Sequence, residues 1–337
     1  MTTSSMTHND NVFKAMCDDK LYLVTDHNFE ECGEVADTNG YLVVIGATLS
    51  LHELAEFTAK AKAHEVKAVF MRPFEFCGNV VAIACCNKYS EELNSELKEL
   101  KNGTDAVHVK NIPSLNHPGV MLLDMDSTCI QIECIDEIAR AYGVGEQIAE
   151  ITSQAMHGLL DFKQSLRKRV SLLKDAPVSI LEDLRSRLPI MPGFPELVRL
   201  LQDHGWYVAI ASGGFMQFVS KLKEDYNLTL VRANSFEIDG DHLTGGLVGG
   251  IVDSAVKVAT LQELCAQYGI PAEQSVAIGD GANDLPMITA SGLGFAIHAK
   301  PIVRQKAPAT INSFGLDAAA CILEASSRLE RAGLKIK

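Results

Sequence analysis

Two carboxylates stand two residues apart in the segment Asp124-Met125-Asp126-Ser127-Thr128, directly after an apolar run. The first carboxylate of such a pair can attack phosphorus and form an aspartyl-phosphate. The second can protonate the leaving alkoxide and later take a proton from water. Because two adjacent carboxylates would repel a phosphate dianion, this chemistry needs a divalent cation. The spacing of Asp124 and Asp126 therefore indicates a nucleophile and an acid–base group that act on a phosphate ester.

Three further polar motifs follow later in the chain. Ser212-Gly213-Gly214 comes after an apolar run, and we expect it to open a helix whose N-terminal amides suit an anion. Lys257, early in another helical stretch, would neutralise phosphoryl oxygens. Gly279-Asp280-Gly281-Ala282-Asn283-Asp284 adds carboxylates that can complete an oxygen-ligand site, the kind that Mg²⁺ prefers. Each motif alone could be an ordinary turn or solvated surface, but their conjunction favours one site.

Short apolar strands must position these motifs. Strands that are apolar on both faces are typical of parallel sheets covered by helices, where ligands bind beyond the carboxyl ends of the strands. A helical insertion at about 133–195 separates the first two of them. Residues 119–337 are therefore predicted to form an α/β domain with a doubly wound parallel sheet and a helical cap. The predicted strands are Val120–Leu123, Tyr207–Ala211, Ser275–Ile278 and Gly294–Ile297.

The first 110 residues follow the order strand, helix, strand, strand, helix, strand, which is typical of ferredoxin-like α+β domains. By this order of elements, residues 1–110 resemble ACT-type modules. The resemblance implies a ferredoxin-like regulatory or dimerisation domain, through which a homodimer could form. A proline-flanked linker at 111–119 would let the second half fold and act alone. The first 35 residues have no place in this pattern. The predicted elements are Tyr41–Ile45, Leu51–His64, Val66–Phe70, Asn79–Cys85, Glu91–Lys101 and Ala106–Val109.

Composition narrows the class of protein. A net charge of −13 argues against general nucleic-acid binding and against docking on anionic membranes. The sequence has no uncharged apolar run of the ~18 residues that a membrane span needs. Nine scattered cysteines without a regular framework, after a polar N-terminus, predict reduced thiols in a cytoplasmic protein. We expect a small-molecule substrate.

The four motifs together resemble those of the haloacid dehalogenase superfamily of aspartate-nucleophile phosphatases, over about the last 220 residues. The resemblance implies an enzyme that uses Mg²⁺ and supplies a role for each motif residue. It implies Asp124 as nucleophile, Asp126 as general acid–base group and Lys257 as charge stabiliser. At the metal it implies Asp124, the Asp126 carbonyl and Asp280, supported by Asp284. At the phosphate it implies Ser212, Gly213 and Asn283.

The insertion resembles the cap of the phosphoserine phosphatase family through Glu133, Ala155-Met156-His157-Gly158, Phe162 and Arg169-Val170. Phe162 and Arg169 lie two helical turns apart and so share a face. Arg169 can clamp a carboxylate and Glu133 can pair with an ammonium group. The resemblance adds Met156 and Phe162 to the substrate site. A solvated basic helix face remains the alternative for Arg169.

The residues indicate a phosphorylated amino acid as substrate, and the resemblance implies Mg²⁺-dependent hydrolysis of O-phosphoserine to serine and phosphate, the last step of serine biosynthesis. One alternative is a related phosphatase or phosphotransferase that acts on another small phosphorylated amino acid, such as phosphohomoserine. A third hypothesis is a regulatory amino-acid-binding protein. The intact set of Asp124, Asp126, Lys257 and Asp280 argues against it, because a pure binding protein has no need of all four.

Overall fold

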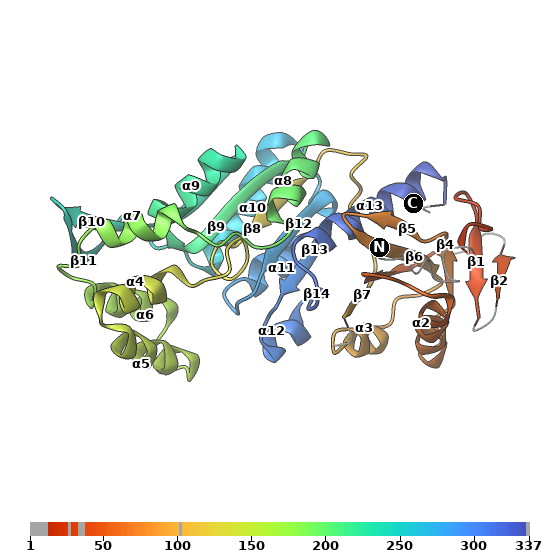
Figure 1. The fold of residues 1–337 in the computed structure, drawn as a ribbon, viewed down its shortest axis with the longest axis horizontal. Helices are drawn as coiled ribbons and strands as arrows, with labels where there is room; N and C mark the ends of the chain where they lie inside the picture. Colours follow the sequence, from red (N-terminus) through yellow and green to blue (C-terminus); the bar gives the residue numbers. More distant parts are fainter. Residues whose placement is uncertain (1–12, 26–27, 33–37, 101–102, 335–337) are drawn as a thin grey trace, which may run out of the picture.

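The computed structural model describes residues 13–25, 28–32, 38–100 and 103–334, which form two sheets with one helix between them (Figure 1). The first sheet is antiparallel, and its strands run in the order β2-β1-β4-β6-β3-β7, with β5 paired to β6. These strands are β1 (Leu21–Val24), β2 (Phe29–Cys32), β3 (Gly40–Gly46), β4 (Ala68–Met71), β5 (Phe74–Phe76), β6 (Asn79–Cys86) and β7 (Thr104–Val109).

The first sheet confirms the predicted ferredoxin-like pattern. Helices α2 (Leu51–Ala63) and α3 (Glu91–Leu97) cover one face, where Leu42 and Val44 of β3 are fully buried. Helix α2 begins at Leu51 as predicted, because the hydroxyl of the preceding Ser50 accepts a hydrogen bond from the Glu53 amide in a capping box. The hairpin of β1 and β2, built from residues that the sequence pattern could not place, extends the sheet beyond β4.

The second sheet has the order β11-β10-β9-β8-β12-β13-β14, parallel except for the antiparallel pair of β10 and β11. Its central strand β8 alternates: Met121 and Leu123 face one hydrophobic core, and Val120 and Leu122 face the other. This is the predicted doubly wound sheet. The strands are β8 (Val120–Leu123), β9 (Tyr207–Phe215), β10 (Leu230–Asp239), β11 (His242–Val248), β12 (Ser275–Gly279), β13 (Leu293–Ile297) and β14 (Ala309–Ile311).

Helices cover both faces of the second sheet. One face carries α10 (Ser254–Tyr268), α11 (Leu285–Ala290) and α12 (Pro301–Lys306). The other carries α8 (Phe194–Asp203), α9 (Met216–Tyr226) and α13 (Asp317–Arg331). The cap at the opposite end of the molecule from the first sheet contains α4 (Cys134–Tyr142), α5 (Gly145–Met156), α6 (Phe162–Ser171) and α7 (Ser179–Ser186) (Figure 1).

The cap differs from the predicted insertion in two ways. Its helices end at Ser186, and α8 already packs on the sheet. The hairpin of β10 and β11, which the sequence analysis did not predict, joins the cap. The amide of Leu243 donates to the carbonyl of Ala176 (2.9 Å), and the amide of Asp175 donates to the carbonyl of Leu243 (2.8 Å). These strands escaped detection because most of their residues are only partly buried, which weakens the apolar pattern.

Helix α13 fills the space between the two sheets. Every residue from Ala318 to Ser327 is buried, and the helix contacts β3 and β6 on one side and α8 on the other. The predicted linker is packed against it: Leu115 donates its amide to Ser327 Oγ (2.7 Å), and Ser326 Oγ donates to the carbonyl of Ile112 (2.9 Å). One hydrophobic core therefore runs from the first sheet through α13 into the second.

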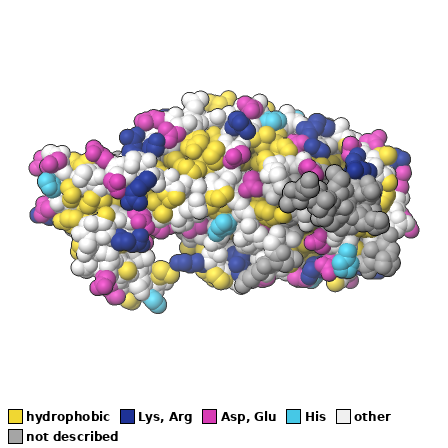
Figure 2. Space-filling view, in the orientation of Figure 1, with side chains coloured by type: hydrophobic (Ala, Val, Ile, Leu, Met, Phe, Trp, Pro, Cys, Tyr) yellow, Lys and Arg dark blue, Asp and Glu magenta, His cyan; other side chains and the backbone are white. Residues whose placement is uncertain are grey.

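The surface carries mixed charge. On the face shown in Figure 2, basic and acidic side chains are interspersed, and the described residues form no broad basic patch there. Among the described residues, no helix is both long and apolar enough to cross a membrane.

Deleting residues 1–110 should give an aggregated product, contrary to the expectation from sequence, because the deletion exposes the apolar face of α13. The soluble yield and the size-exclusion profile would measure this. A matched deletion of residues 1–38 removes only β1, β2 and their flanks, leaves β3 and β6 on α13, and should stay soluble. A monodisperse, folded product from the longer deletion would contradict the shared core.

Candidate active site

A buried ion-pair triad lies at the carboxyl edge of the second sheet. Lys257 of α10 has no exposed surface, and its Nζ lies 2.9 Å from Asp124 Oδ2 and 2.6 Å from Asp284 Oδ1. Burial by itself lowers the pKa of the Lys257 ammonium, but the two carboxylates outweigh burial and raise it. Lys257 is therefore a permanent cation that joins the ends of β8 and β12.

A third carboxylate completes the cluster. Oxygens of Asp124, Asp280 and Asp284 all lie within 4.8 Å of one another, and Thr128 Oγ1 donates to Asp280 Oδ1 (3.3 Å). Burial, and then repulsion between these carboxylates, raises the pKa of Asp280 to about 8 and that of Asp284 to about 6. The cluster thus holds more negative charge than Lys257 balances. An all-oxygen set with surplus charge fits a divalent metal ion.

Asp126 lies beside this cluster in a different state. It is buried, and its Oδ1 has no hydrogen-bond partner among the described residues. Burial, followed by the nearby charges of Glu133 and Asp124, raises the pKa of Asp126 well above its ordinary value. Burial and these charges thus favour the protonated carboxyl more than they would for an exposed aspartate, which suits a group that must donate a proton.

The segment Ser212-Gly213-Gly214 reaches the same place, but not as a helix N-terminus. It lies within β9, and α9 begins only at Met216. Arg232 of β10 pairs with Ala211 and Asn234 with Phe215, so three residues of β9 oppose one of β10. The segment is a bulge, and a Cβ on Gly214 would lie 3.0 Å from Asp126 Oδ2. The segment is therefore part of a strand and does not open a helix as predicted, but it still lies beside the carboxylates.

The β9 bulge places Ser212, and a short loop places Asn283. Ser212 is buried, and its Oγ accepts from the amide of Gly214 (2.9 Å). Asn283 lies in the loop that follows β12, folded over Gly281, where an added Cβ would collide with Asn283 Oδ1. A larger residue at this position would require the Asn283 side chain to move. The carboxylate of Asp284 accepts from the Gly281 amide (3.0 Å).

The cap contributes an acidic and a basic side chain. Glu133, just before α4, accepts from Ser127 Oγ (2.7 Å), and desolvation raises its pKa although the residue is exposed at the site's edge. Arg169 of α6 is half-buried, and its Nε has no partner among the described residues. Burial lowers the pKa of Arg169, opposed by the charges of Asp136, Glu133 and Asp126. The neighbouring Arg167 and Lys168 are exposed, so only Arg169 faces the acidic groups.

The two remaining predicted residues of the cap differ. The ring of Phe162 lies against the Ser212–Gly214 bulge, since a Cβ added to Gly213 would lie 2.9 Å from it. Met156, at the end of α5, is 64% exposed, and its sulfur lies 3.7 Å from Nζ of Lys300. Phe162 thus lies beside the bulge, whereas Met156 lies beside the start of α12.

Two positioning residues escaped the sequence analysis. Asn234 is buried on β10 and bonds both the bulge and the segment before α10. Asp253 caps α10 by accepting from the Val256 amide (3.0 Å), and also pairs with Lys163 of α6 (2.8 Å). A polar residue within a strand was the only available signal for Asn234. An aspartate just before a helical stretch could have indicated Asp253.

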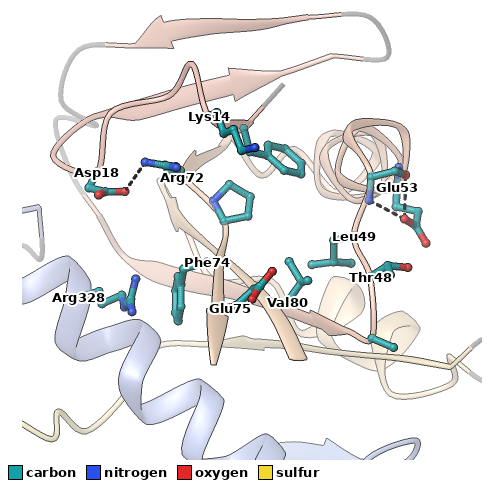
Figure 3. Close-up of a pocket in the computed structure, with 14 residues that line it drawn as sticks. Lys14, Asp18, Thr48, Leu49, Glu53, Arg72, Phe74, Glu75, Val80 and Arg328 are labelled. Carbon is teal, nitrogen blue, oxygen red and sulfur yellow. Dashed lines mark hydrogen bonds and ion pairs between the residues drawn. The ribbon is translucent and has the colours of Figure 1, made fainter. Parts of the chain in front are cut away.

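A large cavity lies elsewhere. About 770 Å³ in volume, it is bounded by the first sheet and α13, with Lys14, Arg72, Phe74 and Arg328 among its lining residues (Figure 3). None of the lining residues belongs to the carboxylate cluster. We place the active site at the carboxylate cluster and not in this cavity, because the predicted attack on a phosphate ester requires the carboxylates and Lys257.

The fold and the carboxylate cluster are those of a hydrolase with an α/β core and a helical cap, and the comparisons with known proteins agree. The family model of haloacid dehalogenase-like hydrolases matches residues 121–289. Phosphoserine phosphatase of Vibrio cholerae is 51% identical over 239 residues, covering 70% of this chain and 72% of the relative. That of Haemophilus influenzae is 50% identical over 217 residues (64% and 69%).

Solved structures give the same relationship. The unliganded probable phosphoserine phosphatase from Vibrio cholerae has a TM-score of 0.72 at 42% identity, covering 88% of this chain and 89% of that one. A substrate-bound phosphoserine phosphatase complex has a TM-score of 0.57 at 40% identity, covering 60% of this chain and 97% of that one. The chain belongs to the haloacid dehalogenase-like hydrolases, within their phosphoserine phosphatase family.

Lys257→Met should lower the free energy of unfolding by about 3–5 kcal/mol, because it leaves two buried carboxylates without their cation. Urea unfolding in the presence of a chelator would measure the change. Lys168→Met, on the exposed face of α6, is the matched control and should stay within about 0.5 kcal/mol of the wild type. Equal effects of the two substitutions would contradict the structural role of the triad.

Proposed function

We propose that this protein hydrolyses O-phosphoserine to serine and inorganic phosphate through an aspartyl-phosphate on Asp124. The observation that carries the proposal is the juxtaposition of the Lys257-bound Asp124 with Asp126, whose burial and acidic neighbours favour the protonated form. One carboxylate is paired with a lysine, and the other lies in surroundings that favour its protonated form. This division of labour is the one that phosphoryl transfer from an alcohol requires.

Asp124 acts as the nucleophile. Its Oδ1 accepts from the Met125 amide (2.7 Å) and its Oδ2 is paired with Lys257 (2.9 Å), which fixes the carboxylate at the strand end. A carboxylate oxygen attacks phosphorus while the bond from phosphorus to the serine oxygen breaks. Lys257, with Ser212 and the bulge, stabilises the phosphoryl oxygens. Asn283 lies on the neighbouring loop and holds the same group.

The metal would be held by Asp124, Asp280 and Asp284, together with the carbonyl of Asp126. This oxygen set is suited to Mg²⁺. When bound, the ion supplies positive charge to the phosphoryl oxygens and offsets the repulsion among the carboxylates.

Asp126 serves as acid and then as base. Its proton passes to the serine oxygen as that oxygen leaves. The resulting carboxylate then takes a proton from a water molecule that attacks phosphorus, which breaks the bond to Asp124 and releases phosphate. The same carboxyl group can serve both steps because it gives up its proton in the first step and takes one back in the second.

The cap recognises the amino-acid part of the substrate. The unpartnered Nε of Arg169 and its buried environment suit a carboxylate clamp, and Glu133 provides a partner for the ammonium group. The ring of Phe162 lies against Gly213 of the bulge, and Met156 is exposed. An anion site, a cation site and a phosphate site together define a phosphorylated amino acid.

The chain's remaining parts receive roles from sequence. We treat residues 1–110 as a regulatory or dimerisation domain and residues 119–337 as the phosphatase domain, and a homodimer through the former stays a prediction. All nine cysteines are free, which supports a cytoplasmic location.

Asp126→Asn should cut turnover of phosphoserine by about 100-fold or more, because the poor alkoxide leaving group needs a proton. With p-nitrophenyl phosphate, whose leaving group needs none, a burst of p-nitrophenolate should persist in rapid-mixing experiments. Asp124→Asn is the matched control and should show no burst with this substrate. Loss of the burst from both variants would contradict the acid–base role of Asp126.

Chelation with EDTA should abolish hydrolysis, and Mg²⁺ should restore it better than Ca²⁺, since Ca²⁺ binds oxygen at longer distance and loosens the alignment for attack. Activity measured after metal replacement would show this, with circular dichroism to confirm that the chelated protein stays folded. Full activity after exhaustive chelation would exclude a metal from the reaction.

Arg169→Ala should lower kcat/KM for phosphoserine about 10- to 150-fold, the loss expected for a charge-assisted hydrogen bond of about 1.5–3 kcal/mol. Phosphoethanolamine, which lacks the carboxylate, should be a poor substrate of the wild type and lose little more. Glu133→Gln should show the mirror pattern and spare phosphoglycolate. Phosphohomoserine and phosphothreonine complete the panel.

An equal loss on phosphoserine and phosphoethanolamine would show that Arg169 is not the carboxylate clamp. Preference of the wild type for phosphohomoserine over phosphoserine would replace the proposed substrate while leaving the chemistry in place.

A further inference from the structure

The bulge at Ser212–Gly214 takes backbone groups out of the strand ladder, and the side chain of Asn234 bonds one of them. A bulge removes its residues from the ladder between neighbouring strands, so their polar backbone groups need other partners. The carbonyl of Gly213 accepts a hydrogen bond from Asn234 Nδ2 at 2.7 Å. Asn234 comes from β10, the strand against which the bulge forms, and is 2% exposed.

The same side chain holds a second segment. Asn234 Oδ1 accepts from the amide of Val252 at 2.9 Å. Val252 immediately precedes Asp253, the residue that caps α10, and α10 carries Lys257 in its first turn. The two ends of one amide therefore tie the bulge to the start of the lysine helix.

We propose that Asn234 is a positioning residue for the phosphoryl group, an inference that rests on the proposed function. By holding the Gly213 carbonyl toward β10, Asn234 turns the Ser212 side of the bulge toward the carboxylates. By holding Val252, it fixes where α10 begins and hence where Lys257 enters the site. Asn234 does not touch the substrate; it acts through Gly213 and Lys257.

The chemistry selects asparagine at this position, because the side chain must donate to a carbonyl and accept from an amide. An ionised aspartate in its place can accept but not donate, and it sets a charge against the Gly213 carbonyl. A protonated aspartate restores both bonds. Asn234→Asp should therefore misplace the bulge at neutral pH and recover it as pH falls.

The test compares variants with the wild type across the pH range in which all stay folded. At neutral pH, Asn234→Asp should lower kcat/KM for phosphoserine about 10- to 100-fold, the cost of misplacing a reacting group. It should also weaken inhibition by inorganic phosphate. The ratio of its kcat/KM to that of the wild type should rise as pH falls. Asn234→Leu, which can neither donate nor accept, should show the loss without the recovery.

Using the ratio removes titrations common to all the proteins. The charged groups on the neighbouring segments include Asp126 beside the bulge, Asp253 beside Val252, and Lys163 paired with Asp253. On β10 itself they are Arg232, Glu237 and Asp239. Asn94→Asp is the matched control: Asn94 is also buried and also donates to a carbonyl, that of Pro308, but far from the carboxylates. It should lower Tm and leave kcat/KM and phosphate inhibition unchanged.

The outcomes separate the two proposals. Asn234→Asp with wild-type phosphate inhibition and only a lowered Tm would show that Asn234 is structural, as would a loss that does not change with pH. If Asn234→Asp does not fold, Asn234→Ser, which keeps a small hydroxyl, should still weaken phosphate inhibition. If the wild type does not hydrolyse phosphoserine, the proposed function is wrong. The role of Asn234 can then still be tested by comparing how phosphate shifts the Tm of the wild type and of Asn234→Asp.

Discussion

The whole catalytic edge depends on the burial of Lys257 between two carboxylates. Asp124 ends β8 and Asp284 begins the helix after β12, and neither could be buried there without a cation in reach. The lysine enters from a third element, α10, so three parts of the chain are joined at one point. Because an unpaired buried charge costs far more than a paired one returns, the triad fixes the relative position of these elements.

Around that fixed point, the fold arranges two kinds of support. On one side, β10 carries Asn234, which bonds the bulge, and its hairpin partner β11 is hydrogen-bonded to the cap. The hairpin therefore connects the bulge to the cap. On the other side, α13 is shared by both sheets. Asp105 of β7 accepts from the amides of Asn312, Ser313 and Phe314, just after β14. The first sheet is thus a structural part of the catalytic half.

The sequence by itself determined the class of fold and predicted the carboxylates of the site. Asp124, Asp126 and Asp280 were predictable because each follows a short strand that is apolar on both faces, and the change to polar residues at its end is abrupt. The ferredoxin-like half was predictable for the same reason, with a capping box that marks the start of α2 at Leu51. Local patterns suffice where burial is uniform over an element and ends sharply.

Tertiary structure decided what depends on a partner distant in sequence. The Ser212–Gly214 segment has the composition of a turn before a helix, and only pairing with β10 makes it a bulge. Helix α13 is buried on all sides because two sheets enclose it, a fact that no periodicity in its own residues could reveal. The raised pKa of Asp126 likewise arises from burial beside Glu133 and Asp124. Desolvation and strand pairing are properties of assembled surroundings, so they appear only when the chain has folded.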